Sequence, residues 1–351
     1  MSALRRECEA AAARLREWLL RGPVQVAEGP QAGGIVGSFT PAGEPAYVYG
    51  EITGYYLHWL AGLPHDARVA ANAVAACAWA ARWFSRADDT PTRIHFGEPP
   101  SDWRNDAVFL FDLAMLARGL AVADRARLCT VPATLSDALG RAISRFHDGG
   151  RLLPLLRIRP DAQLPDRWST RDDAFLLKAA TRVLDARPPI AVDDDMLDAC
   201  SAFQRRRAPL AGEAPVEMLH PTLYYLEAVL AGDARHWPGA ARLLARLLAL
   251  RNDAFELPEA PPADGPRRSD VIAQALRVGT FLRARGVDGA PDADVLDGLA
   301  RALVARVAPD GTIAFRVDTN ERQPNAWCAM FAEQALRWHA DPAAADAALL
   351  V

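Results

Sequence analysis

Apolar residues recur at helical spacing along most of this 351-residue chain, in two alternating sets of segments. The first set follows long, irregular loops. Its segments begin near Gly50, Asn105, Thr170, Glu217, Ser269 and Asn325. The second set lies between them after shorter connections, and it covers roughly 65–86, 132–146, 193–207, 236–250 and 293–307. A period of about 55 residues built from two helices indicates repeated helical hairpins, which must stack on their neighbours to bury their apolar faces.

A helix over residues 2–20 supplies the twelfth element. We therefore predict one all-α domain spanning 1–351, an (α/α)6 toroid of six helical hairpins whose N-terminal helix closes the ring beside the last hairpin. The first set is apolar on nearly every face and should form the inner helices, whereas the second carries more Arg and Asp. Two short β-like pieces, 93–96 and 312–317, are predicted as strands in loops at one rim. A chain of this length often forms two domains, so a two-domain helical structure is the alternative.

The net charge of −4 and the pI of about 6.0 provide no basic field for nucleic acid. The first 17 residues carry charges throughout, and no run of 18 apolar residues occurs, so neither a signal peptide nor a membrane segment is expected. The five cysteines are widely spaced and form no CxxC pair, which argues against disulfides and zinc. We expect a cytoplasmic protein that needs no metal or other cofactor.

In a toroid of this kind the long loops meet over the N-termini of the inner helices, where a concave site favours anionic groups. The segment YVYGEITGYY places Glu51 in the first turn of an inner helix, and it contains four of the six tyrosines in the chain. A carboxylate among aromatic rings can have a raised pKa and act as a general acid. The structural alternative is that Glu51 complements the helix dipole.

Three later segments provide partners for Glu51. Asp270 is a candidate second carboxylate, because most glycosidases use a pair, and Ser269 before it is a candidate helix cap. His220, at a helix start, is a candidate base or proton shuttle, with a loop histidine whose hydrogen bonds are satisfied as the alternative. The predicted catalytic residues are Glu51, Asp270, His220 and Tyr55.

Aromatic rings and arginines in the same loops suit a sugar, because rings stack on its C–H faces and a guanidinium holds carboxylate or phosphate. The predicted ligand-binding residues are Tyr49, Trp103, Trp168, Arg171, Tyr224, Arg268 and Trp327. Four charged residues lie deeper, about two turns into successive inner helices. Because a buried charge must be paired, we predict structural ion pairs between Lys178, the only lysine, and Glu227, and between Arg277 and Glu333.

These motifs, in this order, resemble those of bacterial polysaccharide-biosynthesis proteins with a six-hairpin glycosidase-like toroid. The motifs are GEITGYY, FLFDLAMLARGL, RWSTR, LHPTLYYLE, RSDVIAQALR and NAWCAMFAEQAL, between about Gly33 and Leu336. Members of that family often have proline before the glutamate of the first motif, where this chain has Gly50. The resemblance implies a toroid fold and a role in a glycan pathway.

We therefore expect a protein that acts on or binds a saccharide or glycoconjugate, with acid–base catalysis of the hydrolase, lyase or epimerase type. A non-catalytic glycan-binding or assembly subunit is one alternative. An isoprenoid-type toroid enzyme, which would carry an acidic metal motif inside its cavity, is another. The only DDxxD-like run in this chain, 194–198, starts a predicted outer helix, where helix capping explains the acidic residues. The sugar and the oligomeric state are left open.

Overall fold

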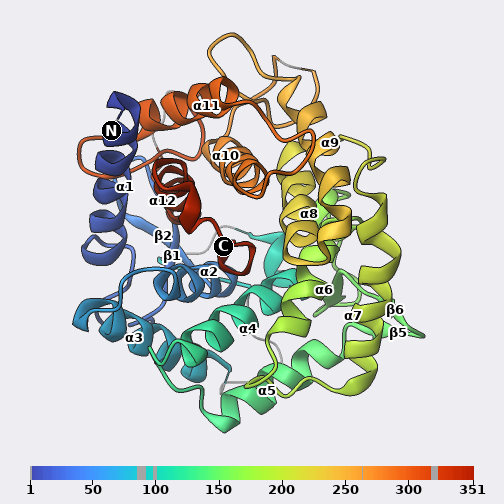
Figure 1. Ribbon diagram of the computed structural model, residues 1–351. Helices are drawn as coiled ribbons and strands as arrows, with labels where there is room; N and C mark the ends of the chain where they lie inside the picture. The colour runs from blue at the N-terminus through green and yellow to red at the C-terminus, as the bar shows by residue number, and fades with distance from the viewer. Residues whose placement is uncertain (1, 85–91, 98–100, 263, 318–322) are drawn as a thin grey trace. The chain divides into compact units, whose positions relative to one another are not determined.

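The structure is a computed structural model that describes residues 2–84, 92–97, 101–262, 264–317 and 323–351. These residues form twelve α-helices and a few short strands (Figure 1). The chain divides into two compact units, which are described one at a time. Unit 1 comprises 1–22, 39–44 and 206–351, and unit 2 comprises 23–38 and 45–205.

Unit 2 contains three consecutive helical hairpins. Their helices are α2 (Gly50–Ala61), α3 (Ala67–Phe84), α4 (Leu110–Arg125), α5 (Ala133–Ser144), α6 (Leu176–Asp185) and α7 (Asp194–Arg207, within the unit to Arg205). The inner helix α4 packs between α2 and α6, while α3 and α5 pack on the outside of α2 and α4 and on each other (Figure 1). Nearly every residue of α2 and α4 is buried, because these helices have neighbours on all sides.

The α2–α4 contact depends on two glycines. A Cβ atom placed on Gly119 would lie 2.1 Å from the carbonyl oxygen of Gly54, and one on Gly54 would lie 2.4 Å from that of Met115. The two backbones therefore touch directly, which a larger side chain at either glycine would prevent.

Short strands brace the loops of unit 2. Strands β1 (Val36–Phe39), β2 (Pro45–Tyr49) and β3 (Arg93–His95) form a sheet in that order, with Tyr49 opposite Arg93 in an antiparallel pair. Strand β4 (Ala107–Phe109) pairs with β7 (Leu155–Arg157), and β5 (His147–Asp148) pairs with β6 (Arg151–Leu152). The predicted strand at 93–96 is thus confirmed, and β2 and β4 lead directly into α2 and α4.

Unit 1 also has three inner helices, α8 (Leu219–Ala231), α10 (Ser269–Ala284) and α12 (Ala326–Ala340). Helix α10 packs between α8 and α12, with α9 (Trp237–Leu248) and α11 (Ala293–Arg306) on the outside (Figure 1). Helix α1 (Ala3–Arg21) lies along α12 and also contacts α11. The third pair of this unit is therefore built from the two ends of the chain.

The predicted strand over 312–317 is not formed. Single bridges join Arg268 to Arg316 and Ala314 to Pro324 instead, and Ser269 N–H donates to the Phe315 carbonyl at 3.0 Å. The segment crosses between the starts of two helices, so it pairs briefly with each rather than continuously with one. Ser269 is likewise not a cap, because it is the first residue of α10 and its hydroxyl donates to the Ala314 carbonyl.

The predicted helix positions agree closely with the observed ones. The exceptions are α4 and α6, which begin later than the expected starts near Asn105 and Thr170. Short 3-10 turns, Trp103–Asp106 and Trp168–Thr170, occupy those positions. Polar residues at a loop end suit a turn as well as a helical first turn, so the pattern does not distinguish them.

We expect Gly119→Ala to destabilise the protein by about 3 kcal/mol, because the added methyl group would collide with backbone that cannot rotate away. Gly286→Ala is the matched control. Gly286 has φ +65°, but no atom lies within 4 Å of the place that the added methyl group would take, so only backbone strain of about 1 kcal/mol opposes that change. Urea unfolding of the variants measures both effects. Equal destabilisation by the two substitutions would contradict the close backbone contact.

Candidate functional site

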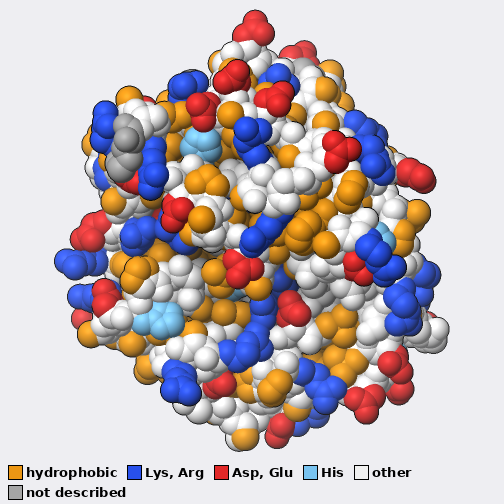
Figure 2. Space-filling model, viewed as in Figure 1, with side chains coloured by type: hydrophobic (Ala, Val, Ile, Leu, Met, Phe, Trp, Pro, Cys, Tyr) orange, Lys and Arg blue, Asp and Glu red, His pale blue; other side chains and the backbone are white. Residues whose placement is uncertain are grey.

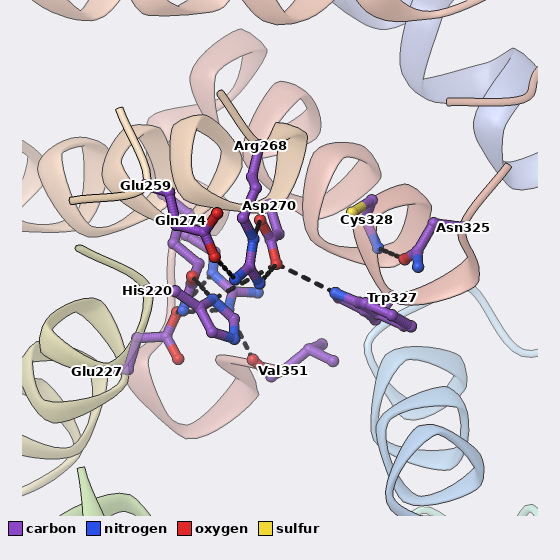
Figure 3. A network of polar contacts seen from close by, with 11 residues as sticks. His220, Glu227, Glu259, Arg268, Asp270, Gln274, Asn325, Trp327, Cys328 and Val351 are labelled. Atoms are coloured by element: carbon purple, nitrogen blue, oxygen red, sulfur yellow. Dashed lines mark hydrogen bonds and ion pairs between the residues drawn. The ribbon is translucent and has the colours of Figure 1, made fainter. Parts of the chain in front are cut away.

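Five of the predicted site residues come together in unit 1, at the starts of its three inner helices. His220 and Tyr224 lie in the first two turns of α8, Asp270 follows the start of α10, and Trp327 follows the start of α12. Arg268 is the residue before α10. Figure 3 shows the side chains of His220, Asp270 and Trp327 pointing toward one another. We call these five residues, together with Gln274, the His220 network.

Asp270 is at the centre of this network. It is fully buried, and it accepts hydrogen bonds from Arg268 Nε at 3.0 Å, Arg268 Nη2 at 2.5 Å and Trp327 Nε1 at 3.1 Å. Burial raises the pKa of the carboxyl, but the Arg268 guanidinium, His220 and these hydrogen bonds outweigh that effect and bring the pKa to about 2. Asp270 is therefore ionised across the physiological pH range.

Arg268 connects this carboxylate to the surrounding loops. Its Nη1 lies 3.2 Å from Glu259 Oε1, and the other oxygen of Glu259 lies 2.7 Å from Arg316 Nη2. The same loop holds the start of α8, since Leu219 N–H donates to the Glu259 carbonyl at 2.9 Å. Two ion pairs and one backbone hydrogen bond thus tie the beginnings of α8 and α10 to the loop before α12.

His220 is a buried, neutral histidine with a defined tautomer. Its Nδ1 lies 2.7 Å from Gln274 Oε1 and 3.4 Å from Asp270 Oδ2, and both of these atoms accept hydrogen bonds. Gln274 Nε2 donates to Glu227 at 3.2 Å, so Gln274 must present its oxygen to the imidazole. Nδ1 therefore carries the proton and Nε2 the lone pair.

Burial, followed by the nearby positive charge of Arg268, lowers the pKa of His220 to about 4, despite the opposing effect of Asp270. The Asp270 carboxylate pairs mainly with Arg268. It therefore orients the imidazole of His220, but it does not raise the pKa of that imidazole above the ordinary value. The Tyr224 ring lies 4.3 Å from the imidazole, centre to centre. At neutral pH the imidazole is therefore uncharged, and its Nε2 lone pair is in the state that accepts a proton, although the lowered pKa makes it a weaker base than an ordinary histidine.

The deeper charges of unit 1 pair differently from the prediction. Arg277 is in contact with Glu227, to which its Nε donates at 3.0 Å, and with Gln334. Glu333 pairs with Arg16 of α1 at 2.6 Å and with Arg337 at 3.1 Å. The predicted Arg277–Glu333 pair is therefore wrong, because Glu333 faces the outer helix α1 while Arg277 faces α8.

A second group of predicted residues comes together in unit 2, around Glu51. Tyr49 OH donates to Asp112 Oδ2 at 3.0 Å, and Lys178 Nζ lies 5.0 Å from the centre of the Tyr55 ring. Burial raises the pKa of Glu51, while the Tyr49 hydroxyl, Lys178, Arg93 and the Tyr55 hydroxyl act in the opposite direction. The raised pKa is the direction that the tyrosine-rich motif predicts.

Asp112 is the partner of Glu51 in this unit, and the sequence reasoning missed it. Burial raises its pKa well above the ordinary value, and the negative charge of Glu51 raises it further. Glu51 is buried and Asp112 is half-buried, and two carboxyls that interact in this way titrate as a pair. This pair therefore keeps a proton at a pH where an isolated carboxyl has lost it.

The remaining predicted residues of unit 2 lie on its loops. Trp103 packs edge-on against Phe109, with the Arg104 guanidinium 4.4 Å and that of Arg167 5.6 Å from its ring centre. Trp168 packs edge-on against Phe175. Arg171 forms a two-pronged pair with Asp166, at 2.6 and 2.9 Å, on the surface. Arg171 is thus ion-paired within the protein, and its role in ligand binding stays a prediction.

Two predicted pairs, Glu51 with Asp270 and Lys178 with Glu227, join residues of different units, and they stay predictions. Two important residues were not predicted as site residues. Gln274 is the only glutamine in its motif, and it lies one turn beyond Asp270. Asp112 lies in FLFDLAML, in the first turn of α4 as Glu51 is in the first turn of α2, and a single acid in an apolar run was the available signal.

Among the residues that the structure describes, no three His, Cys, Asp or Glu side chains gather in a way that could hold a metal ion. None of the helices in these residues is long and apolar enough to cross a membrane. On the face seen in Figure 2, Lys and Arg side chains are interspersed with Asp and Glu.

The whole chain is similar to several solved structures. A D-mannose isomerase matches with a TM-score of 0.69 at 11% sequence identity, and the match covers 97% of this chain and 99% of the isomerase. The chain has the (α/α)6 toroid fold. A cellobiose 2-epimerase from Spirochaeta thermophila (TM-score 0.66, 16% identity) and a glycosidase in complex with glucose (0.64, 12%) match over the same shares of both chains. No protein-family model and no curated protein sequence matches this chain.

The fold prediction made from the sequence is therefore confirmed. At these identities the similarity concerns the fold, and it leaves the reaction to be inferred from the site.

We expect Asp112→Asn to raise the melting temperature at pH 8 by about 2–4 °C. The raised pKa means that Asp112 holds its proton more tightly in the folded protein than in the unfolded chain. The carboxyl therefore destabilises the folded protein increasingly as the pH rises above the pKa that Asp112 has in the unfolded chain. The amide carries no charge to desolvate, and the gain should shrink toward pH 4. Thermal melts of both proteins at the two pH values measure this. An equal rise in melting temperature at both pH values would contradict a proton shared by Glu51 and Asp112.

We expect His220→Asn to flatten the pH dependence of stability between about pH 6.5 and 4. The native pKa of about 4 lies below the ordinary 6.5, so the unfolded chain binds the proton more tightly. Stability from neutral His220 is thus present above pH 6.5 and is lost as pH falls, by up to about 1.4 kcal/mol per pH unit. Asn offers a comparable N–H donor but does not titrate. Urea unfolding across this range tests the difference, and parallel curves would refute it.

Proposed function

We propose that this protein is a carbohydrate-acting enzyme in which His220 transfers a proton at the carbon next to the carbonyl of an open-chain sugar. The observation that carries the proposal is the buried His220–Gln274–Asp270 arrangement in the first two turns of the inner helices α8 and α10. A neutral imidazole whose tautomer is fixed by its neighbours has its Nε2 lone pair available to remove a proton from carbon.

The reaction follows from that geometry. The sugar loses its C2 proton to Nε2 of His220, the electron pair forms the C1–C2 double bond of an enediol, and the C1 carbonyl oxygen takes a proton from water. To form the epimer, C2 takes a proton from water on the other face, the C1 hydroxyl returns its proton to water, and the C1 carbonyl re-forms. To form the ketose, C1 takes the proton held by His220, the C2 hydroxyl gives its proton to water, and a carbonyl forms at C2. Asp270 holds the imidazole in orientation through this cycle, since its charge is neutralised by Arg268.

Aromatic neighbours support a sugar as the substrate. Tyr224 and Trp327 border His220 and Asp270, and flat rings stack on the C–H faces of sugars. The fold shared with a D-mannose isomerase and a cellobiose 2-epimerase supports the same substrate class. Arg268, beside Asp270, is proposed as a ligand contact. The other predicted residues, Glu51, Tyr55, Tyr49, Trp103, Trp168 and Arg171, belong to unit 2, are not assigned to the reaction at His220, and stay predictions.

Hydrolysis through Asp270 has less support, because a carboxyl with a pKa of about 2 is a poor general acid. The resemblance of the motifs to polysaccharide-biosynthesis proteins supports a place in such a pathway in the bacterial cytoplasm. The non-catalytic alternative is a protein that binds glycans through the same residues.

Solvent exchange tests the proposal. The protein is incubated with D-mannose, D-glucose and cellobiose in D2O, and proton NMR follows the C2 signals and any new sugar. We expect loss of the C2 proton signal with at least one sugar. His220→Asn should slow the exchange by about 100- to 10,000-fold.

The matched control is His236→Asn, which changes a histidine outside the network in the same unit and should exchange at the wild-type rate. Undiminished exchange in His220→Asn would refute the role of His220. Binding of these sugars without any exchange by the wild type would favour the non-catalytic alternative.

A further inference from the structure

We propose that unit 2 contains a second ligand site, a cavity that binds a small sugar carrying an anionic group. The cavity has a volume of about 740 Å³, and all the residues that line it belong to unit 2. Binding sites for small molecules commonly have volumes of about 300–1,000 Å³. It shares no residue with the His220 network.

The Glu51–Asp112 pair forms one wall of the cavity. Both side chains line it, together with Tyr49, whose hydroxyl is bonded to Asp112. Both carboxyls have raised pKa values, which favours a proton shared between them, and a pair in that state offers both a donor and acceptors. Sugar hydroxyls, which donate and accept at the same time, require this combination.

Arginines line another wall. Arg141 and Arg145 lie one turn apart at the end of α5, and Arg157 lies at the end of β7. All three are solvent-exposed, and no ion pair within the described residues involves Arg141 or Arg145. Positive charges without an internal counter-ion at the edge of a cavity favour an anionic group on the ligand.

Aromatic rings complete the lining, and one of them has an unmet polar group. Trp83 lines the cavity and is 9% exposed, yet its indole Nε1 has no hydrogen-bond partner among the described residues. A buried donor without a partner is costly, so a ligand that accepts from it is favoured. Gly50 makes room for this ring, because a Cβ there would lie 2.5 Å from Trp83 Cη2.

These walls define the ligand class. Carboxyls that bind hydroxyl groups, rings that stack on a sugar face and arginines that hold an anion match a monosaccharide or disaccharide bearing phosphate or carboxylate. An anion without hydroxyl groups would leave the carboxyl pair without a hydrogen-bond partner. The negative charge of the pair would also repel such an anion. A neutral sugar would leave the arginines unused.

Calorimetric titration with four probes tests the site. The probes are glucose 6-phosphate, glucuronate, glucose and inorganic phosphate. We expect at least one of the anionic sugars to bind about 10-fold or more tightly than both glucose and phosphate. Which one binds distinguishes a phosphate from a carboxylate as the recognised group.

Two variants and a control place the binding in the cavity. Arg145→Gln should weaken the anionic sugar about 10-fold while leaving glucose unaffected. Ala142→Phe fills the cavity from the partly exposed surface of α5 and should abolish binding of the sugar. Arg68→Gln removes an exposed arginine of unit 2 that does not line the cavity, and it should bind as the wild type does.

The proposal is overturned if neither anionic sugar binds at about 10 mM, if glucose or phosphate binds as tightly, or if Ala142→Phe still binds. The result is independent of the reaction proposed at His220, because no residue of the His220 network lines the cavity. His220→Asn should retain binding in the cavity even where it loses solvent exchange, and the cavity variants are judged by binding alone.

Discussion

The buried pair between Arg268 and Asp270 organises the His220 network. Breaking a buried ion pair by removing one partner commonly costs about 3–5 kcal/mol, because the other charge remains out of water. Here the same two side chains also hold Trp327, Glu259 and the orientation of His220. The conformation of three helix starts and two loops therefore depends on one charge pair, which explains why so many polar groups can be buried together at this place.

The architecture was readable from the sequence because it depends on periodicity. Long apolar segments with short and long connections in alternation leave few alternatives to stacked hairpins, and the twelve helices of the described residues match the twelve expected. The convergence of His220, Asp270 and Trp327 followed from their positions at helix starts.

Details that depend on the direction of side chains could not be predicted from the sequence. Arg277 and Glu333 have similar depths on adjacent helices, but α12 turns Glu333 toward α1, where it pairs with Arg16. Asp112 was overlooked because a lone acid in an apolar segment resembles a dipole partner. Its importance depends on how close α4 lies to α2, and a single sequence gives no such distance.

The glycine contact between α2 and α4 has a chemical consequence. Gly54 lies one turn after Glu51, and Met115, whose carbonyl it touches, lies one turn after Asp112. The backbone contact therefore sets how near the two acids must be, and with it how strongly each opposes the ionisation of the other. The uncharged residues at this backbone contact thereby influence the pKa values of Glu51 and Asp112. A change in the spacing between α2 and α4 would by itself change the proton affinity of this carboxyl pair.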